Sequence, residues 1–574
     1  MSKILNKFSK IITQPKNRGA AQAMLYALGL SPNDLNKPQI GVCSMWYDGN
    51  PCNSKLNLIQ DKIKCSISKT KQIPMRFNTI GVSDGMSMGT FGMRYSLPSR
   101  ELIADSIETI MSAQHYDGLV CIPGCDKNLP GSVMGMMRLN RPSCVVYGGS
   151  MRPQNHNGNT LDIVSAFESF GSYLKGDIND KERQSIVENS CDSKQCGSCS
   201  GFYTANTMAC LIEVMGLSLP NSSSNMSLSK EKFNECDEIG SIMKHLIEND
   251  IRPRDIVTKK SLENAIRMLY AIGGSTNAII HILAIAQEAN IDFSVEDCKK
   301  WEHIPVLTNM KPHGIYCMSD LNKIGGTSVL CKYLIEEGIL DGSTQTITGK
   351  SLWDNVSGYK SLFINDVHHN DDKSIVPVRH CSQNQIINST KSPFKRDSHI
   401  KILKGLLAPN GCISKIYSEH HEFNGRAIVF NSEDEMLNSL QNGNIKKDHF
   451  IILRYQGESI GCPEMLAPTS ALVGYFGNEQ PPPLATDGRF SGGSKGILVA
   501  HLPDAYKNGS PTALIEDDDI ITVSTVNNTI EICVDPEKLK RRKPKNVPPI
   551  LQNKGYLNKF NKLVGSIESG YSTT

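Results

Sequence analysis

Short apolar runs alternate with amphipathic stretches from about residue 20 to 370. The run 119–122 follows the turn pair Asp117-Gly118 and predicts a buried strand, and a second run at 144–147 follows Pro142. Apolar residues at 102, 103, 107 and 110 share one helical face, as do those at 208, 211, 212 and 215. This alternation of strands and helices predicts an N-terminal α/β sandwich domain.

The pattern changes at residues 368–399, which are polar and show neither helical nor strand periodicity. Beyond them, β-like runs recur at 427–430, 450–453, 520–523 and 530–534. We therefore expect an N-terminal tail at 1–18, an α/β domain at 19–367, a linker at 368–399 and a smaller β-rich domain at 400–574.

Composition narrows the class of protein. The chain has 574 residues, which suggests two or more domains, and 39% hydrophobic with 21% charged residues is typical of a soluble globular protein. The net charge of +3 is too small to favour nucleic acid as a partner, and no basic tract has interleaved aromatics. No apolar stretch approaches the length of a membrane span.

The eighteen cysteines are scattered through a chain too long for a disulfide scaffold. We expect a reducing compartment in which most thiols are small core residues and a few bind metal. The first eighteen residues are basic and contain no acid, which favours a frayed, solvated tail, with a short mitochondrial transit peptide as the alternative. The expected location is cytoplasmic, with the mitochondrial matrix or a plastid as alternatives.

Three loop segments carry the candidate chemistry: 49–53, 83–85 and 124–127. The third follows the predicted strand at 119–122 and precedes a helical stretch. In open α/β sheets, ligands bind in the crevice beyond the carboxyl ends of the strands. In this loop Cys125 offers a soft thiolate ligand and Asp126 offers a hard carboxylate ligand. Such a pair suits a soft metal and a hard metal bound next to each other.

Cys52, Cys125 and Cys199 all lie in loops that contain Gly or Pro. Three thiolates would hold an iron–sulfur cluster with one iron open to substrate, since fully ligated clusters normally take four cysteines. From spacing alone, three buried structural thiols remain the commoner explanation. Cys196 forms a C-x-x-C pair with Cys199, but no second pair accompanies it, and we predict that Cys196 is dispensable.

Asp84, Asp126 and Glu464 are candidate oxygen ligands for Mg²⁺, although each alone is more often a turn or cap residue. Lys127 beside them would repel the cation, so it either points away or is carbamylated. The Gly-rich segment 486–493 is either a mobile loop or a close approach to a small ligand that presents Ser491. The segment 272–277 opens a helix and either binds an anion or simply caps it.

Together these segments resemble the family of dihydroxy-acid, 6-phosphogluconate and sugar-acid dehydratases, nearly from end to end. The resemblance rests on many specific motifs in the same order, among them Trp46–Asn53, Ser83–Gly89, Tyr95–Glu101, Cys125–Lys127, Tyr203–Met208, Gly273–Asn277, Lys323–Gly326, Pro463–Met465 and Thr486–Gly493.

The resemblance implies an N-terminal α/β domain, a barrel-like C-terminal domain and a homodimer. It implies a [2Fe–2S] cluster on Cys52, Cys125 and Cys199, with Mg²⁺ held by Asp84, Asp126, Glu464 and a carbamylated Lys127, and it implies Ser491 as the base. The implied reaction dehydrates 2,3-dihydroxy-3-methyl carboxylic acids to 2-keto acids in valine and isoleucine biosynthesis.

Two departures from the family pattern leave alternatives open. The segment 457–462 is two residues shorter than usual, which leaves a sugar-acid substrate as an alternative, and the segment 192–198 before Cys199 is two residues longer. A catalytically silent, cluster-binding paralogue is the third possibility. The presence of Ser491, Lys127 and all the expected ligands argues against it.

Overall fold

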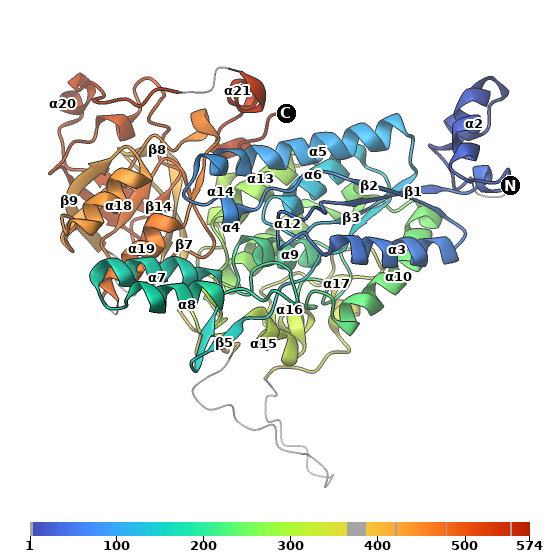
Figure 1. Ribbon diagram of the computed structural model, residues 1–574, viewed down its shortest axis with the longest axis horizontal. Coiled ribbons are helices and arrows are strands. Elements are labelled where there is room, and N and C mark those ends of the chain that lie inside the picture. The colour runs from blue at the N-terminus through green and yellow to red at the C-terminus, as the bar shows by residue number, and fades with distance from the viewer. Residues whose placement is uncertain (1–3, 364–385, 419–421, 478, 551–553) are drawn as a thin grey trace, which may run out of the picture.

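The structure is a computed structural model that describes residues 4–363, 386–418, 422–477, 479–550 and 554–574. It has an α/β domain at one end and a closed β-barrel at the other, as Figure 1 shows. The predicted fold class, α/β sandwich followed by a barrel-like β-rich domain, is therefore confirmed. None of the described helices is both long and apolar enough to cross a membrane.

A four-stranded parallel sheet forms the centre of the first domain, in the order β2-β1-β3-β4. Its strands are β1 (Gln39–Ser44), β2 (Ile73–Asn78), β3 (Gly118–Ile122) and β4 (Ser143–Val145). Every residue of β1 and β3 is buried, which explains why the run at 119–122 is apolar throughout rather than alternating.

Helices cover both faces of this sheet. An added Cβ at Gly41 of β1 would meet Met111 of α5 (Ser96–Ala113), whereas one at Gly118 of β3 would meet Met243 of α10 (Lys230–Asn249). Further helices complete this domain: α3 (Leu56–Lys69), which packs on β1 and β2, α6 (Asn128–Leu139), α9 (Thr204–Val214), α12 (Lys259–Ala271) and α13 (Asn277–Glu288). The helical faces predicted at 102–110 and 208–215 belong to α5 and α9.

The barrel closes in the order β10-β12-β14-β8-β7-β16-β15-β9. Its strands are β7 (Ile400–Gly405), β8 (Ala408–Ile416), β9 (Glu422–Phe430), β10 (His449–Leu453), β12 (Leu484–Thr486), β14 (Ile497–Ala500), β15 (Ile520–Ser524) and β16 (Thr529–Ile532). All four β-like runs of the sequence fall on barrel strands. Closure removes the exposed edges that an open sheet of this size would present.

The two domains meet in a tight helix crossing. In α7 (Ile163–Lys175) and α19 (Ala467–Phe476), an added Cβ at Gly171 would collide with the carbonyl of Ala471, and one at Gly474 with the carbonyl of Glu168. Only glycine permits such a close approach of two backbones. This crossing fixes the chain that immediately precedes α19 against the first domain.

Two segments differ from their predicted character. The predicted linker 368–399 lies partly outside the described residues (368–385), and its remainder forms isolated bridges to Val306 and Thr308 of the first domain. Part of the predicted N-terminal tail is packed rather than frayed, because Ser9 is fully buried and bonds to Asp117. The domain boundaries themselves stay a prediction.

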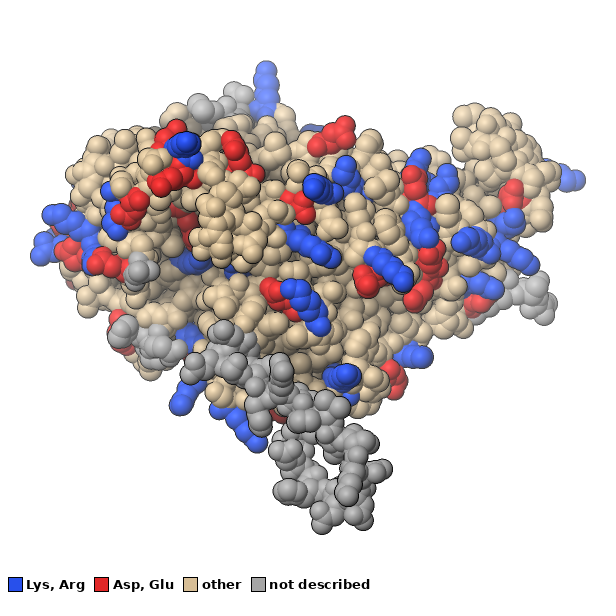
Figure 2. All heavy atoms as spheres, turned by 60° about the horizontal axis from the view of Figure 1, so that its bottom comes forward, with Lys and Arg blue, Asp and Glu red and all other residues tan. Residues whose placement is uncertain are grey.

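Most of the described cysteines are buried, and all of them are free thiols. Cys43, Cys121 and Cys144 are fully buried in the core around the sheet, in line with their prediction as small apolar core residues. The face shown in Figure 2 carries basic and acidic side chains interspersed, without a broad patch of one sign.

Asp117 is the anchor of the N-terminal segment. Its carboxylate accepts hydrogen bonds from the backbone of Phe8 (2.7 Å), the backbone and hydroxyl of Ser9 (3.0 and 2.6 Å) and the backbone of Gln39 (2.8 Å). We expect Asp117→Ala to release this segment, since donors left buried without an acceptor cost about 1–3 kcal/mol each. Trypsin should then cut at the exposed Lys10 and Lys16 about tenfold faster, the factor that corresponds to about 1.4 kcal/mol.

The matched control is Asp61→Ala, which removes an exposed aspartate paired with Arg76 and should leave cleavage unchanged. Equal protection of the segment in Asp117→Ala and wild type would show that the apolar contacts of the segment suffice to hold it.

Candidate active site

The loops after the first three strands meet at one edge of the sheet. Cys52 lies between β1 and α3, Asp84 begins the short helix α4 (Asp84–Ser87) after β2, and Cys125, Asp126 and Lys127 lie between β3 and α6. Because the strands are parallel, their carboxyl ends share this edge. The predicted crevice therefore gathers five of the eight candidate residues.

Local hydrogen bonds shape these loops. Asn128 accepts a bond from the backbone of Cys125 (3.0 Å), and Ser83 caps α4 by accepting one from the backbone of Met86 (3.4 Å). An added Cβ at Gly124 would collide with the carbonyl of Cys52, so the first and third loops are packed backbone to backbone. This packing places Cys52 beside Cys125.

Cys199 reaches the same place from the chain beyond β4. Ser198 pairs with the segment after β4, donating its N–H to Gly149 (3.0 Å) and accepting one from Met151 (2.7 Å), and its hydroxyl donates to the carbonyl of Gly124. The Cys52 thiol lies beside the thiols of Cys125 and Cys199, and their interaction with it, together with burial, raises the pKa of Cys52 well above its ordinary value.

These contacts unite the three cysteines proposed from the sequence. The sulfur of Cys196, the other member of the C-x-x-C pair, is directed at the carbonyl of Ser193 (3.8 Å).

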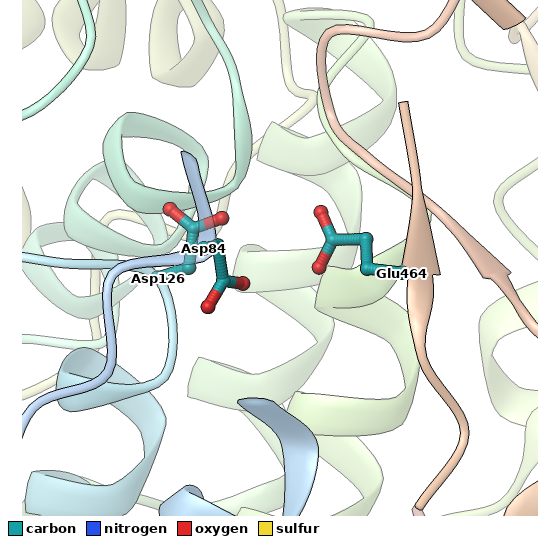
Figure 3. A group of neighbouring side chains, drawn as sticks. All are labelled: Asp84, Asp126 and Glu464. Carbon is teal, nitrogen blue, oxygen red and sulfur yellow. The ribbon is translucent and has the colours of Figure 1, made fainter. Parts of the chain in front are cut away.

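Glu464 enters from the second domain. It lies in β11 (Glu464–Met465), which pairs in parallel with β13 (Arg489–Phe490), directly before α19. One carboxylate oxygen from each of Asp84, Asp126 and Glu464 lies within 4.8 Å of the others. Figure 3 shows Asp84 and Asp126 on one side facing Glu464 on the other. Among the described residues this is the only group of three or more His, Cys, Asp or Glu side chains whose ligand atoms all lie that close together.

Lys127 is fully buried among these carboxylates. Its ammonium donates to Asp84 and to Oε2 of Glu464, each at 2.7 Å. The alternative that Lys127 points away from the site is therefore wrong. Burial opposes the charge of Lys127, but the carboxylates of Asp84 and Glu464 outweigh it and raise the pKa of the amine. The ammonium thus occupies a place suited to a cation.

The donor set fits a hard divalent cation. Burial raises the pKa of the Asp126 carboxyl well above its ordinary value, and the Asp84 carboxylate adds to the shift while Lys127 opposes it. Oε1 of Glu464 is buried and has no hydrogen-bond partner. A buried carboxylate oxygen without a partner is costly unless a cation takes it, and Mg²⁺ prefers carboxylate oxygens.

The Gly-rich segment 486–493 is held in place, so its interpretation as a mobile loop is wrong. The Ser491 N–H donates to the carbonyl of Met465 (3.1 Å), next to Glu464. An added Cβ at Gly492 would lie 2.5 Å from the backbone nitrogen of Thr204, close to the segment that carries Cys199. Ser491 itself is 9% exposed, and its hydroxyl accepts one bond, from the N–H of Gly493 (3.4 Å). The backbone of Ser491 thus bonds to the residue after Glu464, and the next residue packs on the start of α9, beyond Cys199.

Three residues at the site have no role in the sequence-based prediction. Ser96 donates to Asp84 (2.8 Å), Arg489 donates to Glu464 (3.1 Å), and Asn277 accepts from Arg489 (2.6 Å). Arg489 and Asn277 belong to motifs noted in the sequence, but they are 212 residues apart and no local pattern links them. The segment 272–277 does open a helix, α13, and the side-chain amide of its Asn277 donates to the carbonyl of Phe490 in the second domain (3.0 Å).

Comparisons with known proteins cover the whole chain. The family model "Dihydroxy-acid/6-phosphogluconate dehydratase N-terminal" matches residues 37–355, and its C-terminal counterpart matches residues 385–571. A protein of Francisella tularensis subsp. novicida named dihydroxy-acid dehydratase is 46% identical over 579 residues, covering 100% of both chains.

Two fungal proteins named mitochondrial dihydroxy-acid dehydratase are similarly related to this chain. The one from Schizosaccharomyces pombe is 44% identical and covers 100% of this chain and 94% of its own. The one from Saccharomyces cerevisiae is 45% identical and covers 99% of this chain and 96% of its own. The similarity therefore extends across both domains and the site between them.

Proposed function

The chain belongs to the dihydroxy-acid/6-phosphogluconate dehydratase family, and on that premise we propose that it is a hydro-lyase that dehydrates 2,3-dihydroxy-3-methyl carboxylic acids to 2-keto acids. The natural substrates would be 2,3-dihydroxyisovalerate and 2,3-dihydroxy-3-methylvalerate, in valine and isoleucine biosynthesis. The observation that carries this proposal is the meeting of Asp84, Asp126 and Glu464, from two domains, beside three thiols and Ser491.

We assign Asp84, Asp126 and Glu464 to a Mg²⁺ ion, with Lys127 as a fourth ligand in its carbamylated form. The partnerless Oε1 of Glu464 and the all-carboxylate donor set support this assignment. Carbamylation joins CO₂ to the neutral amine with release of one proton and turns a cationic side chain into an anionic one. It would remove the repulsion that an ammonium exerts on Mg²⁺.

We assign Cys52, Cys125 and Cys199 to a [2Fe–2S] cluster. Three thiol ligands leave one iron position open, which is the condition for a cluster that acts on substrate rather than only transferring electrons. When bound, Mg²⁺ would supply Lewis-acid stabilisation of the charge that develops at C2, and the cluster would assist departure of the C3 hydroxyl.

The chain's own residues provide the base and the enclosure. Loss of the C2 proton needs a base, and Ser491 is the candidate presented at the junction. A serine hydroxyl ordinarily has a pKa far above 7, so Ser491 acts as a base only where a nearby cation favours its alkoxide. Burial of the site excludes water and strengthens that electrostatic effect. The enol that forms after loss of water then tautomerises to the keto acid.

We favour this substrate over a sugar acid because the full-length relatives are named for dihydroxy acids. A silent paralogue is disfavoured because the chain retains Ser491, Lys127 and all the proposed ligands. The family resemblance also supports a homodimer. It leaves the cytoplasm as the expected location, with the mitochondrial matrix or a plastid as alternatives.

The cluster assignment predicts the behaviour of four cysteine variants. Anaerobically purified wild-type protein should be brown, and Cys52→Ser, Cys125→Ser or Cys199→Ser should lose most of the bound iron. Cys196→Ser should retain the iron, since the Cys196 sulfur is directed at the carbonyl of Ser193 (3.8 Å). Iron content and visible absorbance measure both effects. If Cys196→Ser loses the iron and Cys199→Ser keeps it, then Cys196 rather than Cys199 is the cluster ligand.

The Mg²⁺ assignment predicts a dependence on the divalent cation. The protein should convert 2,3-dihydroxyisovalerate to a keto acid, lose this activity after thorough chelation and regain it with Mg²⁺. Asp84→Asn and Glu464→Gln should each raise the Mg²⁺ concentration required, because each removes one ligand charge. Labelling with ¹³C-bicarbonate should add a carbamate carbon signal that Lys127→Arg lacks. Full activity without any divalent cation would rule out the assignment.

Ser491→Ala tests the base. Turnover should fall by about 10²–10⁴, the usual contribution of a positioned general base, while cluster absorbance and Mg²⁺ affinity stay at the wild-type level. The matched control is Ser494→Ala, just beyond the same segment, which removes a hydroxyl that donates to the carbonyl of Met465 (3.1 Å) and should change kcat far less. A near-normal kcat in Ser491→Ala with an intact cluster would show that another residue is the base.

A further inference from the structure

Arg489 is a fully buried cation whose guanidinium group joins three parts of the site. Its Nε donates to the carbonyl of Cys462 (2.8 Å), and its Nη1 donates to Asn277 (2.6 Å) and to Oε2 of Glu464 (3.1 Å). Arg489 also lies opposite Glu464 in the pairing of β13 with β11. Backbone and side chain thus hold the same glutamate.

Asn277 connects this arrangement to the first domain. It stands at the start of α13 and is fully buried, and its Oδ1 accepts the bond from Arg489. Its Nδ2 donates to the carbonyl of Phe490 (3.0 Å) and to the hydroxyls of Thr204 (3.2 Å) and Ser275 (3.3 Å). Because both ends of the amide are engaged, Asn277 fixes the guanidinium relative to the domain that carries Asp84 and Asp126.

The two oxygens of Glu464 differ sharply as a result. Oε2 accepts from both Lys127 and Arg489, whereas Oε1 is buried without a partner. The guanidinium contacts Glu464 through Nη1 alone, while Cys462 and Asn277 hold its Nε and Nη1, so its position relative to Oε2 is set by groups outside the carboxylate. The arrangement therefore selects which oxygen of Glu464 remains free.

We propose that Arg489, anchored by Asn277, is a positioning residue that holds Glu464 by Oε2 and leaves Oε1 free for the divalent cation shared with Asp84 and Asp126. The inference rests on the proposed function, since it concerns the same Mg²⁺. If Lys127 becomes a carbamate, its ammonium bond to Oε2 is lost. Arg489 is then the remaining side-chain donor to Glu464 among the described residues.

Charge repulsion and positioning predict opposite changes in Mg²⁺ affinity when Arg489 is removed. A guanidinium held 3.1 Å from a metal-binding carboxylate would repel Mg²⁺, so its removal would tighten Mg²⁺ binding. Positioning predicts that its removal weakens binding, because residues that orient metal ligands typically contribute about 10- to 100-fold to metal affinity. Whether Mg²⁺ affinity rises or falls on removal of Arg489 therefore distinguishes repulsion from positioning.

The experiment measures Mg²⁺ affinity calorimetrically on anaerobically purified, chelator-treated protein that retains its cluster absorbance. Arg489→Met should bind Mg²⁺ about 10- to 100-fold more weakly than wild type. Arg489→Lys keeps the charge but not the planar fork, so it should also bind more weakly. Lys495→Met is the matched control, since it removes a cation nearby in the sequence that pairs instead with Glu168 (2.8 Å), and it should change Mg²⁺ affinity less than twofold.

Asn277→Ala provides an independent variant, because it leaves Arg489 and Glu464 in place and removes only the anchor. It should weaken Mg²⁺ binding severalfold. Unchanged or tighter binding in any of the three site variants with intact cluster absorbance would overturn the inference. If Arg489→Met loses the cluster, the Mg²⁺ affinity of Arg489→Lys tests the inference in its place. If the wild-type protein itself does not bind Mg²⁺, the proposed function is wrong. This outcome differs from failure of the inference, which shows only in the variants.

Discussion

The structure depends on how it balances three carboxylates buried together at a domain junction. Like charges at such short range repel strongly in a medium of low dielectric constant, and each also loses its hydration. Lys127 and Arg489 bring two cations into contact with Glu464, and Lys127 bridges to Asp84 as well. The two domains are thereby joined by an electrostatic requirement, since neither holds a complete set of charges on its own.

The remaining architecture serves to bring these charges together accurately. The parallel sheet delivers three loops to one edge, and the backbone contact between Gly124 and Cys52 sets two of them side by side. From the other domain, the crossing of α7 and α19 at Gly171 and Gly474 fixes the chain just beyond Glu464. The contact of Gly492 with Thr204 does the same for Ser491. At each of these places a side chain would separate the backbones, so glycine sets the distance between groups that must interact.

The sequence predicts those features that depend on local pattern. The strand runs, the helical faces and the gathering of Cys52, Asp84 and Cys125 at one edge follow from periodicity and from the rule that parallel strands share their carboxyl ends. Local pattern does not predict that Lys127 turns inward, because that orientation is set by Glu464, 337 residues away. The anchoring of Arg489 by Asn277 escapes prediction for the same reason, as does the packing of Ser9 on Asp117. Such polar contacts between distant segments leave no periodic trace in the sequence.

The charges at the junction also explain why Lys127 suits two states of the site. With Lys127 as an ammonium and all three carboxyls ionised, three carboxylates face two cations and one net negative charge remains. In the proposed loaded state, a carbamate makes four anions, and these face Mg²⁺ and Arg489, which again leaves one net negative charge. Mg²⁺ beside an unmodified ammonium would instead bury a net positive charge. With the three carboxyls ionised in both states, exchange of the ammonium for a carbamate and Mg²⁺ keeps the net charge of this group of side chains constant. Arg489 is the cation common to both states, which is consistent with its fixed position between Glu464 and Asn277.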